Sequence, residues 1–237
     1  MRGDLLAALV AARQRNEPVV LVRNLATGGE FMVTPREFFG DTETIDLTLR
    51  DAARAALDVD GARMVKAAGQ PFFIQTLAAP PRIVIIGAVH IAQALIPMAA
   101  RAGYDIYLID PRTAFANAER FPDIDVDNRW PDEAMGELQL DIRTAVVTLS
   151  HDPKIDEPAL RAAMDSDAFY IGALGSKGNH QKRLGRLAEL GYSTEQLARI
   201  HGPIGLPLGG RSPAEIAVAT LAQIIQVRHE AGRRSRS

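Results

Sequence analysis

Four short clusters of glycine, serine, histidine and charged residues stand out along the chain, and each directly follows an apolar run. The clusters are Gly87-Ala88-Val89-His90, Asp110-Pro111-Arg112, Ser150-His151-Asp152 and Gly172-Ala173-Leu174-Gly175-Ser176-Lys177. Glycine turns let a backbone approach a phosphate, carboxylates accept hydrogen bonds from ribose hydroxyls, and histidines hold or move protons. Such residues after successive apolar runs favour a site for a phosphate-bearing or nucleotide-like ligand.

The first cluster is close to a dinucleotide-binding fingerprint but departs from it. Gly87 supplies the tight turn, whereas Val89 and Ala92 occupy the positions of the second and third glycines. A valine at the second position obstructs the close approach of a pyrophosphate, which weakens the prediction of ordinary NAD binding. His90 stands where a helix is expected to begin, a place suited to an anionic ligand group or, equally, to a partly buried capping histidine.

The second cluster supplies a carboxylate and a cation. Asp110 follows Gly87 at about the spacing of 20 residues that separates the glycine turn from the ribose-binding carboxylate in dinucleotide sites. Arg112 could hold a phosphate through two parallel hydrogen bonds, although an Asp-Pro-Arg turn can equally be structural. These two residues keep the nucleotide interpretation open.

The last two clusters add histidine, hydroxyl and glycine. His151 and Asp152 could orient a ligand, move a proton or bind a metal, but five histidines without any cysteine give no three-ligand spacing, so we expect no metal site. Gly172, Gly175 and Ser176 have the composition of a phosphate-cradling loop but lack the spacing of a P-loop. No Gly-x-Ser-x-Gly motif occurs, so we do not expect a serine hydrolase.

The other three histidines differ in their surroundings. His201 precedes Gly202-Pro203 and could reach the same site, whereas His180 and His229 lie in polar helical patterns and are expected at the surface.

Charge and cysteine content exclude several classes of protein. The chain has 27 Lys and Arg against 29 Asp and Glu, so it carries no basic excess that would suggest a nucleic acid or a membrane surface as partner. Cysteine is absent, which excludes disulfides, thiolate metal sites and a thiol that carries sulfur. We find neither a signal peptide nor an apolar stretch of about twenty residues, and we expect a cytoplasmic protein without a membrane span.

The pair Pro80-Pro81 marks the clearest domain boundary, because two consecutive prolines impose an extended path. We therefore predict a small α/β domain over residues 1–78 and a larger domain over residues 82–237. In the first domain the pattern predicts helices over 4–16 and 46–57 and strands over 18–25, 31–33, 62–67 and 72–77.

In the second domain, strand-length apolar runs alternate with helical patterns, which predicts a Rossmann-like parallel sheet. The expected strands cover residues 83–86, 106–109, 124–126, 145–149 and 168–171. Capping boxes at Ser193 and Ser212 predict the starts of two later helices. Because parallel strands end at one edge of their sheet, we expect the four clusters to meet there.

Six sequence runs carry a resemblance to a known family. In chain order they are PPRIVIIGAVHIAQAL, LIDPR, ERFP, LSHDPKID, YIGALGSKGNHQKRL and HGPIGLPLGGRSPAEIAVATLAQII. Together they resemble the C-terminal domain of the XdhC/CoxI family, the accessory factors of molybdenum hydroxylases, over residues 80–227. The resemblance implies a Rossmann-like domain that acts as a chaperone without catalytic residues of its own.

The resemblance also implies a cofactor and partners. It implies binding of molybdenum cofactor, as molybdopterin or its dinucleotide form, sulfuration with a cysteine desulfurase, and insertion into an apo-hydroxylase such as xanthine or carbon monoxide dehydrogenase. It further implies a homodimer. Family motifs fall on these candidate cofactor-binding residues: Gly87, His90, Asp110, Arg112, His151, Asp152, Gly172, Gly175 and Ser176.

Two departures from the family pattern limit what the resemblance implies. The family usually has Gly-Ala-Gly-His where this chain has Gly87-Ala88-Val89-His90. The N-terminal half is short and lacks the family's Gly-Gly-Cys motif, and residues 41–47, which we place opposite it, offer only carboxylates, hydroxyls and aliphatics. The role of that cysteine is therefore not carried over, and any sulfur must come from a partner enzyme.

Two alternative functions remain open at this point. One is an NAD(P)-dependent oxidoreductase on the same fold, against which stand Val89 and the lack of an obvious acid for hydride transfer. The other is an interaction protein with a vestigial crevice, which Val89 and the missing cysteine motif both permit.

Overall fold

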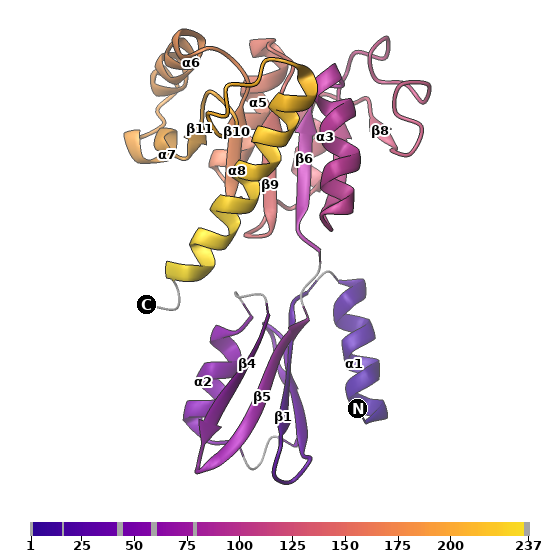
Figure 1. Cartoon of the computed structure of the whole chain (residues 1–237), viewed down its shortest axis with the longest axis vertical. Helices are drawn as coiled ribbons and strands as arrows, with labels where there is room; N and C mark the ends of the chain where they lie inside the picture. The colour runs from indigo at the N-terminus through magenta and orange to yellow at the C-terminus, as the bar shows by residue number, and fades with distance from the viewer. Residues whose placement is uncertain (1, 16, 42–44, 58–60, 78–79, 235–237) are drawn as a thin grey trace. The chain divides into compact units, whose positions relative to one another are not determined.

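The chain forms two compact units, which divide between residues 79 and 80, next to the Pro80-Pro81 pair (Figure 1). The computed structural model describes residues 2–15, 17–41, 45–57, 61–77 and 80–234. Residues 42–44, at the place opposite the family's cysteine motif, lie outside this description.

The first unit is a five-stranded antiparallel sheet with two helices. Its elements are α1 (Gly3–Gln14), β1 (Val19–Asn24), β2 (Glu30–Val33), β3 (Phe38–Gly40), α2 (Leu47–Ala55), β4 (Gly61–Ala67) and β5 (Gln70–Leu77). The strand order is β3-β2-β1-β5-β4, and every neighbouring pair is antiparallel. The short strand β3 has no counterpart in the sequence prediction.

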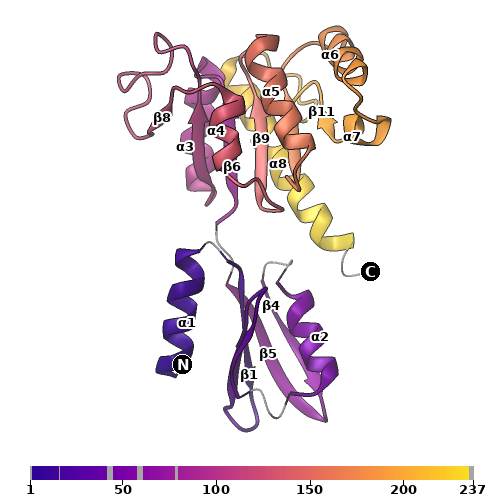
Figure 2. The same cartoon turned by 180° about the vertical axis from the view of Figure 1, so that it is seen from behind.

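The two helices of the first unit cover opposite faces of its sheet (Figures 1 and 2). Val20 and Val22 of β1 pack in one cluster with Leu49 of α2. Val19, which points to the other face because side chains alternate along a strand, packs with Leu5 of α1. This alternation, with apolar residues on both faces, explains why a helix is needed on each side.

The second unit is a six-stranded parallel sheet with helices on both faces. Its elements are β6 (Arg82–Ile86), α3 (His90–Arg101), β7 (Asp105–Ile109), β8 (Val126–Asp127), α4 (Pro131–Glu137), β9 (Thr144–Thr148), α5 (Pro153–Met164), β10 (Tyr170–Ala173), α6 (Lys177–Glu189), α7 (Thr194–Ala198), β11 (Ile200–His201) and α8 (Pro213–Arg234). The strand order is β11-β10-β9-β6-β7-β8, with all pairs parallel. The predicted fold class, a Rossmann-like sheet after a smaller α/β domain, is confirmed.

The helices of the second unit divide between the two faces of its sheet. Ile83 and Ile85 of β6 pack in one cluster with α3 and with Ile224 of α8, while Val84 and Ile86 pack in another with α4, α5 and α6. Figure 1 shows α3 and α8 in front of the sheet. Figure 2, seen from behind, shows α4 and α5 in front of the opposite face. No helix in the described ranges is both long and apolar enough to cross a membrane.

Two local predictions in the second unit are confirmed and one boundary is corrected. The side chain of Ser193 accepts from the N–H of Gln196 at 3.2 Å in a reciprocal capping box, and that of Ser212 accepts from the N–H of Glu215 at 3.3 Å. The fifth strand, expected over residues 168–171, instead covers Tyr170–Ala173. Gly172 is therefore part of β10 and not of the loop that follows.

Candidate functional site

The carboxyl edge of the parallel sheet brings segments from different parts of the second unit together. The N–H of Leu149, just after β9, donates to the carbonyl of Ile86 at 2.8 Å. The N–H of Leu174, just after β10, donates to the carbonyl of Thr148 at 2.9 Å. The turn after β6, the turn after β9 and the segment after β10 are therefore neighbours, as the parallel arrangement predicts.

The turn after β6 requires glycine at its first position. Gly87 has a φ of +111°, and a Cβ atom there would lie 2.8 Å from the backbone nitrogen of Ser150. Val89 is the N-cap of α3 at a φ of −105°, and its side chain makes no capping hydrogen bond. His90 is the first residue of α3 and is exposed, so it is not the partly buried capping histidine that the sequence left open.

Asp110, after β7, is fully buried and holds this turn in place. Its Oδ2 accepts the N–H of Ala88 at 2.7 Å, and the guanidinium of Arg112 donates to both carboxylate oxygens, from Nε at 2.9 Å and from Nη2 at 2.8 Å. Burial alone would raise the pKa of Asp110, but the hydrogen bonds from Arg112 and Ala88 outweigh it and lower the pKa.

This pairing differs from what the sequence suggested for the two residues. The predicted roles were a ribose acceptor for Asp110 and a phosphate clamp for Arg112. Here the Asp110 side chain has 0% exposed area and the Arg112 side chain 31%, and the two bind each other. The reason is local, since the turn after β6 leaves the N–H of Ala88 in need of a buried acceptor.

The turn after β9 is built around a second buried carboxylate, which the sequence analysis did not single out. The hydroxyl of Ser150 donates to Oδ1 of Asp156 at 2.6 Å. Asp152 is the N-cap of α5 and accepts the N–H of Lys154 at 2.9 Å, so its side chain serves the helix start. His151 between them is exposed and has a φ of +63°, a region that non-glycine residues rarely adopt.

The segment after β10 divides the predicted glycine cluster. Gly172 is buried, and a Cβ atom on it would lie 2.7 Å from both the Tyr170 ring and Ile204. It therefore allows close packing and does not face a ligand. Gly175, at a φ of +144°, and Ser176, which caps α6 by accepting the N–H of Asn179 at 3.2 Å, remain at the edge of the sheet.

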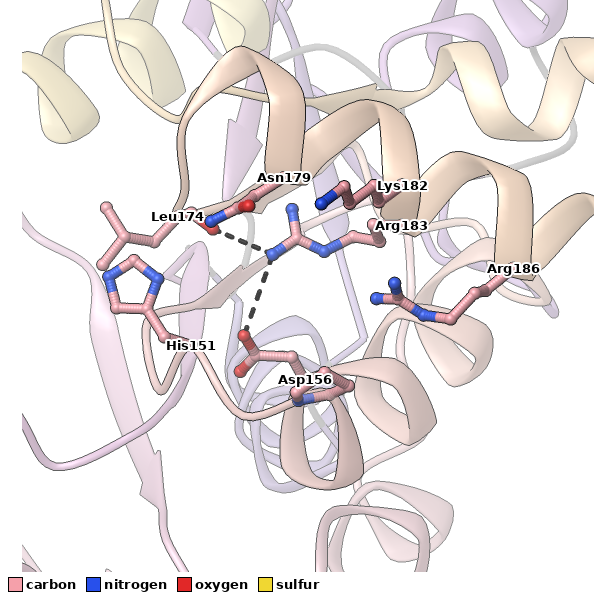
Figure 3. A pocket seen from close by; sticks show the side chains of 8 residues that line it. His151, Asp156, Leu174, Asn179, Lys182, Arg183 and Arg186 are labelled. Carbon is pink, nitrogen blue, oxygen red and sulfur yellow. Dashed lines mark hydrogen bonds and ion pairs between the residues drawn. The ribbon is translucent and has the colours of Figure 1, made fainter.

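A cavity of about 190 Å³ lies between the start of α5 and α6, beside the turn after β9 (Figure 3). Its lining includes four basic side chains and one carboxylate. The lining residues are His151, Pro153, Asp156, Leu174, Asn179, Lys182, Arg183 and Arg186. Of these, only His151 was among the predicted site residues.

A buried ion pair forms the inner wall of this cavity. Nη2 of Arg183 donates to the carbonyl oxygen of Leu174 at 2.8 Å and lies 4.0 Å from Oδ2 of Asp156 (Figure 3). Nη1 of Arg183 and Oδ2 of Asp156 are both buried without a hydrogen-bond partner in the structure. Burial raises the pKa of Asp156 and lowers the pKa of Arg183, because each charge loses its hydration.

The sequence contained a signal for this cavity in the spacing along α6. Asn179 and Arg186 each lie three or four residues from the adjacent pair Lys182 and Arg183, which places all four on one helical face directly after the last glycine cluster. Polar stripes of this kind usually face solvent. The pattern alone therefore did not show that Arg183, which is only 6% exposed, is buried.

Two of the remaining histidines pack into the second unit. His180 was expected at the surface, but it is half-buried, and its Nδ1 is buried without a hydrogen-bond partner in the structure. Burial lowers the pKa of His180 and, to a lesser degree, so does nearby Arg183. His201 stacks on the Tyr170 ring with the centroids 4.9 Å apart, and burial lowers its pKa as well. Neither lines the cavity beside α6.

A larger hollow, of about 720 Å³, lies in the first unit. Its described lining combines aromatic and aliphatic side chains with amides and carboxylates, and it contains no lysine, arginine or histidine. Within the described residues, no three histidine or acidic side chains gather as the ligands of a metal would. The basic cavity of the second unit is therefore the better place for an anion.

Comparison with known proteins relates the second unit to one family. Residues 83–224 match the family model described as the XdhC Rossmann domain. The chain is 35% identical over 147 residues to the molybdenum cofactor insertion chaperone PaoD of Escherichia coli strain K12, a match that covers 62% of this chain and 40% of PaoD. It is 31% identical over 157 residues to a probable xanthine dehydrogenase subunit from Bacillus subtilis strain 168, covering 66% and 46% of the two chains.

The chain spans less than half the length of these curated relatives. Its fold is also similar to a solved structure, that of a xanthine dehydrogenase from Bacillus halodurans. That match has a TM-score of 0.77 at 20% identity and covers 98% of this chain and 68% of the other. At this level of identity the likeness concerns the fold alone.

Proposed function

Because the chain belongs to the XdhC family, with an XdhC Rossmann domain as its second unit, we propose that it is an accessory factor that binds molybdenum cofactor during the maturation of a molybdenum hydroxylase. The name of its relative PaoD, a molybdenum cofactor insertion chaperone, supports this role. Insertion into an apo-hydroxylase such as xanthine or carbon monoxide dehydrogenase is part of the proposal.

One structural observation supports this proposal most directly. The turn after β6, the turn after β9 and the start of α6 adjoin at one edge of a parallel sheet, where Rossmann-like folds bind their ligands. Gly87 packs against Ser150 so closely that no side chain fits between them, which brings the turns after β6 and β9 into direct contact at this edge. His90 and Ser176 lie exposed at the starts of α3 and α6, where the helix dipoles favour an anionic group.

These residues fit a pterin that carries a phosphate. When bound, the cofactor would supply the molybdenum chemistry, and the chain would bind and orient it. Gly87, Gly175 and the N–H groups at the two helix starts would line the edge along which the cofactor lies, with His90 and His151 beside it. Asp110 would hold the turn after β6 in shape without touching the ligand, because it is fully buried, and Arg112 would hold the Asp110 carboxylate in place.

The proposal extends to sulfuration and to assembly. No residue of this sequence is cysteine, so a persulfide cannot form on it, and the sulfur would come from a cysteine desulfurase bound as partner. The cofactor would be carried as molybdopterin or as its dinucleotide form. A homodimer in the cytoplasm is the expected state.

Analysis of bound pterin tests the proposed function. The full chain is purified from cells that express the cofactor pathway, denatured, and examined for released pterin by fluorescence after oxidation. We expect pterin in an amount approaching one per chain. Release of a nicotinamide nucleotide would instead support the oxidoreductase, and release of neither, under conditions that load a related factor, would contradict both.

A further inference from the structure

One nitrogen of the buried Arg183 guanidinium has no hydrogen-bond acceptor among the described residues. The residue is 6% exposed, yet its only described hydrogen bond is that from Nη2 to the carbonyl oxygen of Leu174. Nη1 is buried and has no hydrogen-bond partner among the described residues, and Arg183 is one of the residues that line the cavity between α5 and α6. Buried polar groups are nearly always hydrogen-bonded, so a donor of this kind points to a missing acceptor.

The contact with Asp156 does not replace that acceptor. Its Oδ2 lies 4.0 Å from Nη2 of Arg183, beyond hydrogen-bond distance, and it too has no hydrogen-bond partner. A buried ion pair that only stabilised the fold would be expected to have its donors and acceptors satisfied by direct hydrogen bonds. The open geometry instead leaves the guanidinium facing the cavity, as Figure 3 shows.

The other lining groups make the cavity suited to an anion. Lys182 is exposed and has no hydrogen bond or ion pair with any described residue, while Arg186 is held by Glu157, with Nε 2.7 Å from Oε1. His151 adds a ring nitrogen from the strained turn after β9, in a conformation that functional sites often retain. Arginine and lysine together are the usual ligands of phosphate groups in proteins.

The volume of the cavity limits what can enter it. At about 190 Å³ it is smaller than the roughly 300 to 1,000 Å³ of pockets that enclose a whole drug-sized ligand. It has room for a phosphate group and not for a pterin ring system with its substituents. The cavity therefore fits the charged end of a larger molecule that extends along the edge of the sheet.

We propose that this cavity is a phosphate-binding site in which Arg183 and Lys182 hold a phosphate ester. The proposal rests on the proposed function only for the identity of the molecule that carries the phosphate. Asp156 faces the same cavity and opposes an anion when ionised, but its protonated form donates a hydrogen bond to a phosphate oxygen. A neutral amide at this position would keep the acceptor for Ser150 and remove the repulsion.

Calorimetric titration of the full chain with inorganic phosphate, in low-salt buffer and without cofactor, tests the proposal. We expect saturable binding that is weakened about fivefold or more by Lys182→Ala, since one charged hydrogen bond is lost. Lys66→Ala, an equal change of charge on exposed β4, is the matched control and should leave the affinity unchanged. Asp156→Asn should tighten binding severalfold, whereas a purely structural ion pair predicts no gain.

The experiment distinguishes a failure of the phosphate site from a failure of the proposed cofactor-binding function. Lack of phosphate binding by the wild-type chain, or equal binding by the Lys182→Ala and wild-type proteins, would overturn the phosphate site whatever pterin is found. Phosphate binding without any co-purified pterin would support the site and count against the cofactor role. Glycerol phosphate and pyrophosphate, titrated in parallel, distinguish a terminal phosphate monoester from a nucleotide-linked diphosphate as its source.

Discussion

The carboxylate of Asp110 and the guanidinium of Arg112 face each other in a two-pronged pair, with Nε 2.9 Å from Oδ1 and Nη2 2.8 Å from Oδ2. The same carboxylate accepts the N–H of Ala88 in the turn after β6. One buried side chain thus connects the ends of two neighbouring strands, β6 and β7. The shape of the glycine turn depends on a residue that follows it by about 20 positions.

Replacing this carboxylate should destabilise the second unit. In Asp110→Ala the N–H of Ala88 loses its buried acceptor and Arg112 loses its partner, so we expect the free energy of unfolding to fall by about 2 to 3 kcal/mol. Urea denaturation measures the change. The exposed Asp123, replaced by alanine, is the control and should change stability by less than about 0.5 kcal/mol. Equal stability of the Asp110→Ala and wild-type proteins would refute the positioning role.

The close contact behind Gly87 makes a second prediction. Alanine at this position must adopt a φ of +111° and place its Cβ 2.8 Å from backbone of Ser150, which cannot move aside as a flexible side chain could. Gly103 has a φ of +84° but open space around it, so Gly103→Ala reports the backbone strain alone. We expect the free energy of unfolding to fall by about 1 kcal/mol in Gly103→Ala and by at least about 2 kcal/mol in Gly87→Ala. Similar losses in the two variants would show that the contact is unimportant.

His90 offers a test of ligand binding that leaves the fold intact. Its side chain is exposed and makes no hydrogen bond with any described residue, so His90→Ala should change the free energy of unfolding by less than about 0.5 kcal/mol. If the edge of the sheet binds the cofactor, the same variant should co-purify with severalfold less pterin than the wild-type protein. His229→Ala, also at an exposed position, is the control. Full pterin content in the His90 variant would show that His90 is not part of the binding site.

The packing of His201 predicts how stability depends on pH. Burial lowers the pKa of His201 in the folded chain below the ordinary imidazole value of about 6.5. The unfolded chain therefore binds the proton more readily, and the free energy of unfolding should fall as the pH drops from about 6.5 through the folded pKa. His201→Phe keeps a ring against Tyr170 and removes the titration. Thermal melting between pH 7 and pH 5 should then show a smaller loss of stability.

The matched control for this prediction is exposed His229, whose replacement by glutamine should leave the pH dependence as it is in the wild-type protein. An unchanged pH dependence in His201→Phe would place the responsible group elsewhere, with half-buried His180 as the next residue to replace.

Local patterns predicted the fold well because each depends on residues that are close in sequence. Apolar runs of strand length, separated by helical patterns, indicated the parallel sheet, and the capping boxes at Ser193 and Ser212 indicated two helix starts. The short strands β3 and β11 were missed. They have three and two residues, too few for a pattern, and β11 exists through its pairing with β10.

The candidate site was predicted only in part for a physical reason. Residue type and position after a strand suggested that Asp110, Asp152 and Gly172 contact a ligand. In the folded chain Asp110 accepts from a turn, Asp152 caps a helix and Gly172 allows a close packing contact. A carboxylate at the end of a strand has the same sequence signature whether it faces a ligand or an N–H group of its own chain.

The sequence by itself determined the family, the parallel sheet and the edge at which the clusters gather, because strand direction follows from the alternation of strands and helices. Only the tertiary structure decided which side chains at that edge are buried and which face open space. Arg183 and Asp156 lie on two different helices, and their separation of 4.0 Å arises from how α5 and α6 pack. The cavity that they line is therefore a property of helix packing, which no local pattern in the sequence encodes.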